Sequence, residues 1–269
     1  MAAIIFGLVL LALGGWLLYN RKQNLQKTAN IAALNAANIG ELLEIAQTIR
    51  ADLGGQGAFH EMVGIRGNIT SNNPLSAPLS QKPCVFYRHK VSERYQVTER
   101  VNDAEGNERQ ETKTGNDIVQ QGQQRVRFYL EDNDGQRLLV DPESANIEAR
   151  NSVDDFQAAA GMASTLRFGS FQFNFDKSHF RQPNRKVLGY HYEESVLELG
   201  QEVYAVGELS DQGGELLLSK PRDNSVPFII TPKSKDELLS ARQRNAKNTL
   251  IAAIVILIIG AALLLFGLF

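Results

Sequence analysis

The chain has 269 residues, of which 43% are hydrophobic and 22% charged, with a formal net charge of −2 at pH 7 and one cysteine, Cys84. One cysteine excludes an intramolecular disulfide as well as RING, zinc-ribbon and CxxC redox sites, which need several. The near-neutral charge argues against nucleic-acid binding, because such domains usually have a strongly basic face.

The chain begins with an uncharged stretch at residues 2–19, AAIIFGLVLLALGGWLLY. An apolar helix of this length is just long enough to cross a bilayer. A cleaved signal peptide would have basic residues before the apolar run and a small-residue cleavage site after it. Here the basic residues Arg21, Lys22 and Lys27 follow the run. We therefore predict a retained transmembrane helix.

Residues 21–53 are predicted to form an amphipathic helical stalk. From Leu25 to Leu53 apolar residues recur at steps of three and four, and the GGQG segment at 54–57 ends the pattern. Two interpretations stay open. The stalk either binds a partner or a second copy of the chain, or its apolar face packs on the domain or lies along the membrane.

A mainly β domain is predicted over residues 59–235, because the hydrophobic period changes from 3.6 to 2. RVRFYL and FQFNF alternate, and EVYAVGEL and VPFIIT are β-branched, aromatic runs; the turn signals AEGN, DNDG and QGG lie between such segments. This pattern favours an antiparallel sandwich or a small barrel. The polar residues 102–125 favour a long hairpin loop or flexible excursion. Residues 154–168 favour a short helix, with a loop dipping into the membrane interface as the alternative.

The C-terminal part consists of a basic juxtamembrane segment, 236–248, and an uncharged apolar stretch, 249–269, which we predict to be a second transmembrane helix. Basic residues near both spans lie on the side of the central domain. Lysine and arginine beside a span tend to stay in the cytoplasm. The prediction is a cytoplasmic central domain with both termini on the opposite side.

No metal site, cofactor site or catalytic residue is predicted. The EDNDG segment resembles a calcium loop, but in that register the first ligand position falls on Leu130, so a hairpin turn with Gly135 is favoured. The four histidines are far apart. The adjacent pairs Glu193–Glu194 and Asp154–Asp155 would point to opposite faces of a strand and cannot act together as acid and base. No nucleophile-elbow, P-loop or dinucleotide motif is present.

Four segments, in order, resemble the GIDE domain, also called the BAM (beside a membrane) domain, of the MULAN-type membrane E3 ubiquitin ligases. They are residues 67–88 (GNITSNNPLSAPLSQKPCVFYR), 126–145, 189–209 and 220–239. The resemblance singles out twelve motif residues with mainly structural roles: Pro74, Pro78, Cys84, Tyr87, Asp141, Pro142, Glu194, Leu197, Gly200, Tyr204, Gly207 and Glu208. The chain departs from the family at Ser195, where an aromatic residue is expected.

The resemblance implies a role in binding. These 269 residues hold no RING, so they resemble RING-less bacterial members, of cyanobacterial type, located in the cell or thylakoid membrane. We expect a non-catalytic, two-span protein whose domain binds or scaffolds partner or client membrane proteins, in quality control or stress response. One alternative is the client-recognition half of an E3-ligase-like system whose catalytic module is on another chain. A second is a self-assembling membrane scaffold, a homo-oligomer. In the MULAN-type ligases the domain faces the intermembrane space, whereas the charges here predict the cytoplasm.

Cys84 is interpreted as a packed residue, with a reactive or redox role as the alternative, because a free cysteine usually behaves as a small buried apolar group. A strand that begins at Cys84 would place Phe86 and Arg88 on its face. Tyr87 and His89 would then lie on the other face, so Cys84 and His89 should not meet.

Overall fold

The computed structural model describes residues 2–34, 38–53, 59–102, 107–159, 165–169, 171–174, 184–211, 215–223 and 225–268. The chain forms two compact units. Unit 1 comprises Met1–Gly67, Leu130–Glu148 and Glu202–Phe269, and unit 2 comprises Asn68–Tyr129 and Ala149–Gln201.

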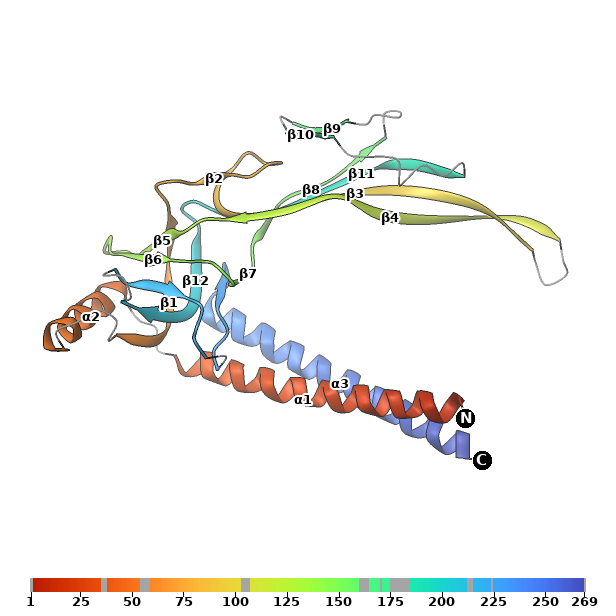
Figure 1. The fold of residues 1–269 in the computed structure, drawn as a ribbon, viewed down its shortest axis with the longest axis horizontal. Coiled ribbons are helices and arrows are strands. Elements are labelled where there is room, and N and C mark those ends of the chain that lie inside the picture. Colours follow the sequence, from red (N-terminus) through yellow and green to blue (C-terminus); the bar gives the residue numbers. More distant parts are fainter. Residues whose placement is uncertain are drawn as a thin grey trace. The chain divides into compact units, whose positions relative to one another are not determined.

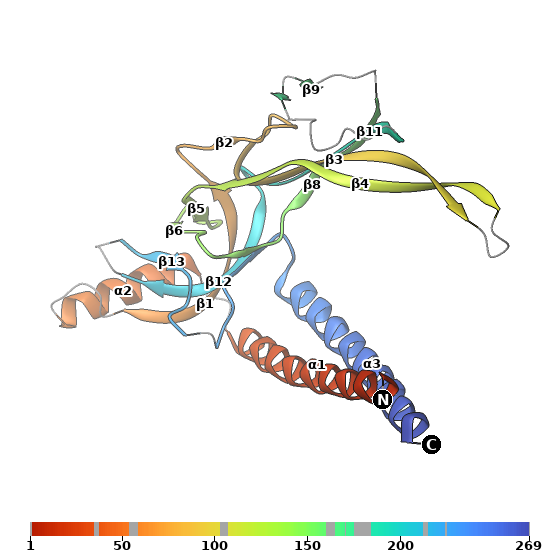
Figure 2. The same cartoon turned by 45° about the vertical axis from the view of Figure 1, so that its right-hand side comes forward.

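Unit 1 contains a pair of long helices, α1 (Ala2–Ala33) and α3 (Lys235–Leu268). They lie side by side and antiparallel, so the N- and C-terminal ends are neighbours (Figures 1 and 2). Both are long and apolar enough to cross a membrane. Their outward side chains are largely apolar and exposed, as at Ile5, Trp16 and Ile258.

Small residues form the seam between α1 and α3. The buried positions Gly7 and Gly14 are seven residues apart on α1, and Ala246, Ala253 and Gly260 follow the same spacing on α3. A Cβ added at Gly14 would lie 2.6 Å from the Leu257 side chain. Glycine and alanine let membrane helices approach this closely, which gains packing contacts where no hydrophobic effect drives association.

The predicted stalk consists of the end of α1 and a separate helix, α2 (Ile39–Leu53). Asn38 begins α2: its backbone carbonyl accepts from Leu42 N at 3.2 Å, and its side-chain oxygen accepts from Gly40 N at 2.7 Å. Leu42 and Ala46 are buried within unit 1. Of the two interpretations left open, the apolar face of α2 therefore packs on the domain. The GGQG segment lies outside the described residues.

A small β-barrel, most of which belongs to unit 1, confirms the predicted fold class. Its sheet has the order β1-β5-β6-β13-β12-β14-β7, and β1 also pairs with β12, so the first five strands close on themselves. The pairs β13–β6 and β14–β7 are parallel. The strands are β1 (His60–Thr70), β5 (Phe128–Glu131), β6 (Arg137–Val140), β7 (Asn146–Ile147), β12 (Glu202–Ser210), β13 (Leu217–Ser219) and β14 (Ile229–Thr231).

The helices are joined to the barrel by a shared apolar core. Ile31 of α1 and Leu238 of α3 pack with Tyr204 and Val206 of β12 and with Ile229 of β14. All five side chains are at most 4% exposed. Burying each one contributes on the order of 1.5–3 kcal/mol, so this cluster fixes the inner ends of both long helices against the barrel.

Unit 2 is an antiparallel sheet in the order β8-β11-β3, with β4 on the other side of β3 and β2 paired with the start of β3. A separate hairpin is formed by β9 and β10. The strands are β2 (Leu75–Ser76), β3 (Pro83–Asn102), β4 (Glu108–Arg125), β8 (Arg150–Ala158), β9 (Thr165–Phe168), β10 (Phe171–Asn174) and β11 (Arg185–Glu198).

The polar segment predicted as a loop or excursion is mostly a strand. β4 pairs with β3 over nearly its whole length, from Arg125 opposite Phe86 to Glu108 opposite Asn102, and the two form a long arm in Figure 1. The loop prediction was wrong because a polar segment still forms a strand when a neighbouring strand, here β3, supplies partners for its backbone hydrogen bonds. The charged side chains also suit an edge strand, where they discourage pairing with other chains. Of the predicted turn AEGN, only Asn107 is described.

The short helix predicted over 154–168 is also wrong where the chain is described. Residues up to Ala158 belong to β8, which pairs with β11, and Thr165–Phe168 form β9. Alanine-rich composition favours helix only weakly, and a strand partner overrides it. Residues 160–164 lie outside the described residues.

Candidate functional site: the open face of the unit 2 sheet

The two faces of the unit 2 sheet differ in chemistry. One face is covered: Val91, Tyr190 and Tyr192 are buried there with Leu79, and the β9–β10 hairpin adds further aromatic contacts. The other face is open and polar. This alternation follows from the period-2 geometry of strands, in which neighbouring residues point to opposite faces. Glu193 and Glu194 are an example, since Glu193 lies on the open face and Glu194 is 2% exposed on the covered one.

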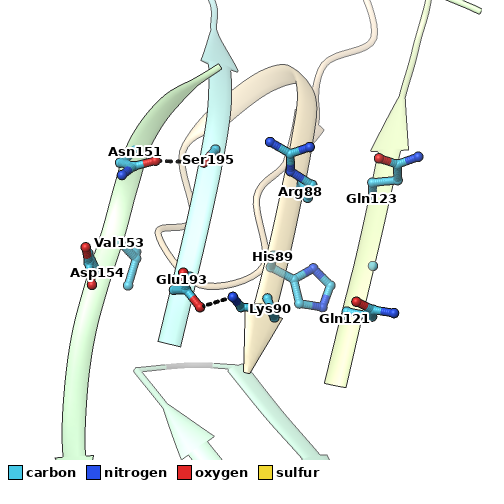
Figure 3. Close-up of a pocket in the computed structure, with 11 residues that line it drawn as sticks. Arg88, His89, Lys90, Gln121, Gln123, Asn151, Val153, Asp154, Glu193 and Ser195 are labelled. Atoms are coloured by element: carbon cyan, nitrogen blue, oxygen red, sulfur yellow. Dashed lines mark hydrogen bonds and ion pairs between the residues drawn. The ribbon is translucent and has the colours of Figure 1, made fainter. Parts of the chain in front are cut away.

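The open face holds a groove of about 740 Å³ that crosses all four long strands. Pairing aligns its residues in rows: Lys90 of β3 stands opposite Gln121 of β4 and Glu193 of β11, and Glu193 in turn stands opposite Asp154 of β8. The next row runs through Arg88 and Ser195 (Figure 3). The lining residues of the open face are Arg88, Lys90, Gln121, Gln123, Asn151, Asp154, Glu193 and Ser195, and His89, Gly122 and Val153, which belong to rows of the covered face, complete the lining.

Acidic and basic side chains both lie in this groove. Lys90 Nζ lies 2.6 Å from a Glu193 carboxylate oxygen, and His191 Nε2 lies 2.6 Å from Asp154 Oδ1. Both pairs are partly exposed, so each contributes little to stability. Their polar atoms therefore stay close to solvent and can exchange partners with a ligand at a small energetic cost.

An apolar end extends the groove. A second hollow of about 520 Å³ shares Lys90 and Glu193 with it and adds Ile118 of β4 and Phe156 of β8. These two large side chains are 53% and 46% exposed. Polar rows that lead to exposed apolar side chains are suited to an extended polypeptide, which offers amides to the rows and a side chain to the apolar end.

The Ser195 hydroxyl in the groove pairs with an amide and not with a base. Ser195 Oγ donates to Asn151 Oδ1 at 2.9 Å, and an amide oxygen is not a general base. Across the described parts of the chain, no group of three His, Cys, Asp or Glu side chains could hold a metal ion.

Beneath the groove, Glu194 holds the proline-rich loop onto the covered face of the sheet. One of its carboxylate oxygens accepts from Leu79 N at 2.7 Å and the other from Ser80 N at 3.0 Å. Both backbone donors would otherwise lack a partner on a face that excludes water. Hydrogen bonds to a buried charge are among the strongest in proteins. The loop that precedes β3 is therefore attached to β11 by one side chain.

His89 is a buried histidine on the same face. It is 7% exposed and packs against the rings of Tyr87 and Phe171, each with a centroid separation of 5.9 Å. Neither ring nitrogen has a hydrogen-bond partner among the described residues. Burial lowers the pKa of His89, and the Glu194 carboxylate offsets part of this. The neutral imidazole is therefore the form that fits the fold.

We expect unit 2 to lose stability in mild acid because of His89. A histidine whose folded pKa lies below its ordinary value contributes fully above about pH 6.5 and loses that contribution as the pH falls further, by at most about 1.4 kcal/mol per pH unit. Hydrogen exchange of β3 between pH 7.5 and 5.5 measures this. His89→Leu should flatten the pH dependence, and His191→Gln, on the open face, should retain it. An unchanged slope in His89→Leu would exclude His89 as the source.

Cys84 lies fully buried in a small cluster with Ala77, Val196 and Tyr87. The predicted face was wrong. Cys84 pairs with Glu198 and Phe86 pairs with the adjacent Leu197, so β3 has one extra residue at this point, a β-bulge. The bulge moves Cys84 onto the face of Tyr87 and His89. Burial is the main reason that the pKa of the Cys84 thiol rises to about 11, which leaves it protonated at neutral pH.

Replacement of Cys84 by serine should lower stability by about 1–2 kcal/mol, because the substitution buries a hydroxyl among apolar side chains. Thermal unfolding of the full chain in detergent measures the loss, and Cys84→Ala is the matched control that removes the sulfur without adding a polar group. Retained binding of partners in Cys84→Ser is the expected functional result. A stable variant without binding would instead indicate a chemical role for the thiol.

Comparison with known proteins assigns the chain to a family. The model of the GIDE family, described as E3 ubiquitin ligase, matches residues 96–266. The chain belongs to the GIDE family. The match begins within β3, so the proline-rich segment 67–88 precedes it. Neither the curated proteins nor the solved structures gave a match.

The twelve residues singled out by the sequence resemblance are divided between the two units. In unit 2 the structure brings together Cys84, Tyr87 and Glu194 on one face, with Leu197 buried on the other. Pro74 is exposed and Pro78 half-buried in the loop that Glu194 holds. Gly200, between β11 and β12, has φ +74°, a conformation that side-chain-bearing residues rarely adopt, and its N–H donates to Ile69 O at 2.8 Å.

Three of these residues, Tyr204, Gly207 and Glu208, lie on β12 in unit 1. The Tyr204 hydroxyl lies over Gly64 so closely that a Cβ there would be 2.1 Å away, and a Cβ at Gly207 would lie 2.7 Å from Ser219 O. Glu208, 6% exposed, accepts from Arg222 N at 2.7 Å and lies 3.1 Å from His60 Nδ1.

Two turns of unit 1 come from short motifs that the sequence singled out. Asp141 begins one of them: its Oδ1 accepts from Glu143 N at 3.1 Å, and the buried Pro142 follows it. The DNDG segment is a hairpin turn between β5 and β6, as predicted. Gly135 has φ +76°, and Asp132 Oδ1 accepts from Gln136 N at 2.9 Å.

The groove residues themselves were not selected from the sequence. Arg88, Lys90 and Ser195 are ordinary polar positions on alternating strands. Only strand pairing brings them together. The available signal was the high share of polar residues in 88–94 (RHKVSER) and 191–195 (HYEES), which indicates a solvent-exposed sheet face without showing what it binds.

Proposed function

We propose that this GIDE protein is a non-catalytic, membrane-anchored binding protein whose unit 2 groove takes up segments of partner or client membrane proteins. The groove is the observation that supports this most directly. It spans four strands, has rows of both charges and ends at the exposed Ile118 and Phe156. A pocket built for a small molecule is more enclosed and has fewer polar groups.

The membrane anchor in this proposal is the α1–α3 pair. Its outward surface is apolar, its seam is built from small residues, and its two outer ends are the chain termini. We place both helices across the membrane, with the domain on the cytoplasmic side because basic residues flank the inner ends. The test is labelling from outside intact cells of a cysteine introduced at Lys113, in a Cys84→Ala background. Strong labelling at this position would show that the domain faces the outside of the cell and would contradict the proposed orientation.

Site-specific photocrosslinking tests the groove. A photoreactive residue at Gln123, which lines the groove, should give adducts with membrane proteins in native membranes. The same residue at Thr114, also exposed on β4 but outside both hollows, is the matched control and should give few. Phe156→Asp should reduce the Gln123 adducts severalfold, because it removes an apolar contact that is worth on the order of 1 kcal/mol. Equal adducts at both positions would contradict binding in the groove.

A second candidate is favoured by the family description. As the client-recognition half of an E3-ligase-like or degradation system, the protein would act with a catalytic module on another chain. Mass spectrometry of the Gln123 adducts distinguishes the candidates: a modifying enzyme or protease in stoichiometric amount would support the adaptor role. Adducts containing only further copies of the chain would support a self-assembling scaffold.

A further inference from the structure

A polar cavity of about 290 Å³ lies in unit 1 between α1 and α3, where both helices change from apolar to polar sequence. Four of its lining residues bear charge: Arg21 of α1, Arg242 of α3, Lys233 just before α3, and Glu148 just after β7. Asparagine and threonine side chains of both helices supply much of the remaining lining. The cavity is therefore polar at the point along α1 and α3 where both helices become apolar.

The cations outnumber the carboxylate, and the carboxylate is already paired. Glu148 Oε2 lies 2.8 Å from Lys233 Nζ and accepts from Thr231 Oγ1 at 2.8 Å. Burial alone would raise the pKa of Glu148, but these two hydrogen bonds, together with the positive charges of Lys233 and Arg242, outweigh it and lower the pKa, so Glu148 is ionised. Arg21 and Arg242 remain as excess positive charge in the cavity.

Arg242 is the group that most needs a partner. Its Nε is inaccessible to solvent and has no hydrogen-bond partner among the described residues. Its side chain lines the cavity beside Glu148, which is already paired with Lys233 and Thr231. Arg21 donates through Nε to Ala246 O at 3.1 Å, and this contact orients its guanidinium across the seam. An anion between the two arginines would satisfy both, because guanidinium groups bind phosphate oxygens in a paired geometry.

The depth of the cavity suits a lipid headgroup. Trp16 and Tyr19 lie shortly before Arg21 on α1 and are 58% and 61% exposed. Exposed tryptophan and tyrosine are enriched where the bilayer meets water. On α3 the uncharged stretch begins at Thr249, which also lines the cavity.

We propose that this cavity binds the phosphate of an anionic phospholipid, with Arg21 and Arg242 as its ligands. The proposal rests on the membrane placement of α1 and α3 given above, and not on binding in the groove. Basic pockets between membrane helices are suited to anionic headgroups.

The test uses the full chain in nanodiscs of phosphatidylcholine mixed with phosphatidylglycerol, followed by native mass spectrometry of the lipids that stay bound. Phosphatidylglycerol should be retained in preference to phosphatidylcholine. Arg242→Gln and Arg21→Gln should each lower that retention about fivefold. This is the effect expected when one basic side chain no longer contacts an anionic headgroup. Arg242→Lys, which keeps the charge, should lose less.

Arg244→Gln is the matched control, since Arg244 is exposed on α3 and does not line the cavity. It should leave retention unchanged. An equal loss in Arg244→Gln, or no preference for phosphatidylglycerol, would overturn the proposal. So would a retained inorganic phosphate adduct that Arg242→Gln abolishes without any lipid preference, because the site would then bind free phosphate. Alkaline extraction of native membranes tests the membrane placement separately, so failure of either part can be recognised.

Discussion

Replacement of Glu194 by alanine is expected to detach the proline-rich loop from the unit 2 sheet and to destabilise that region by about 3–5 kcal/mol. Two buried backbone donors, Leu79 N and Ser80 N, lose a charged acceptor at once. Each such bond is worth about 1.5–3 kcal/mol, and a buried donor left without a partner adds its own penalty. Hydrogen-exchange mass spectrometry of the 72–82 peptide measures the effect directly, and its protection should largely disappear.

The neighbouring residue provides the control for this prediction. Glu193→Ala removes the same number of atoms and the same charge from the adjacent position of β11. Glu193, however, pairs with Lys90 on the open face, where both side chains are more than one-third exposed. Exposed ion pairs contribute about 0–1 kcal/mol. The loop should therefore stay protected in Glu193→Ala. Similar losses in the two variants would show that Glu194 acts through general charge and not through its two hydrogen bonds.

Removal of Arg185 should be about as damaging, with an expected loss of about 3–5 kcal/mol for Arg185→Met. The guanidinium lies 2.8 Å from Glu93 and 2.7 Å from Asp117, and stacks 3.4 Å above the Tyr95 ring. Glu93 is 1% exposed, so it would remain as a buried carboxylate without its cation. Removing one partner of a buried pair is strongly destabilising for this reason. The measurement is the opening free energy of β11 and β3 from hydrogen exchange.

A double variant makes this prediction specific. In Glu93→Gln/Arg185→Met the charge is removed with its partner, and the glutamine oxygen can still accept from the Tyr190 hydroxyl, which lies 3.1 Å from the Glu93 carboxylate. We expect the double variant to be more stable than Arg185→Met alone, because a neutral pair is less costly to bury than one unpaired charge. Additive losses in the double variant would mean that packing, and not the buried charge, determines the effect.

The unit 2 groove and the pair α1–α3 place the proposed activities in different parts of the molecule. Substitutions at Gln123 or Phe156 should affect partner adducts without changing lipid retention. Substitutions at Arg242 should do the reverse. Independent responses of this kind would separate the recognition of partners from attachment to a particular lipid.

The amino-acid sequence by itself determined the elements whose signals are local. The uncharged stretches 2–19 and 249–269 predicted the long terminal helices, because helix length and apolarity are read within about 20 residues. β-branched and aromatic runs such as EVYAVGEL predicted strands of the barrel. The DNDG turn was predicted because Gly135 can adopt a positive φ, whatever surrounds it.

Tertiary structure decided what depends on pairing between distant segments. β4 is a strand because β3 supplies hydrogen bonds along its length, although its polar composition favoured a loop. The bulge near Cys84 reversed the face predicted from simple alternation, since one extra residue shifts every side chain before it. The groove rows and the Arg21–Arg242 cavity likewise join residues that are more than 30 positions apart. Local periodicity states which residues share a face, but only the register between strands and the packing of helices determine what that face meets.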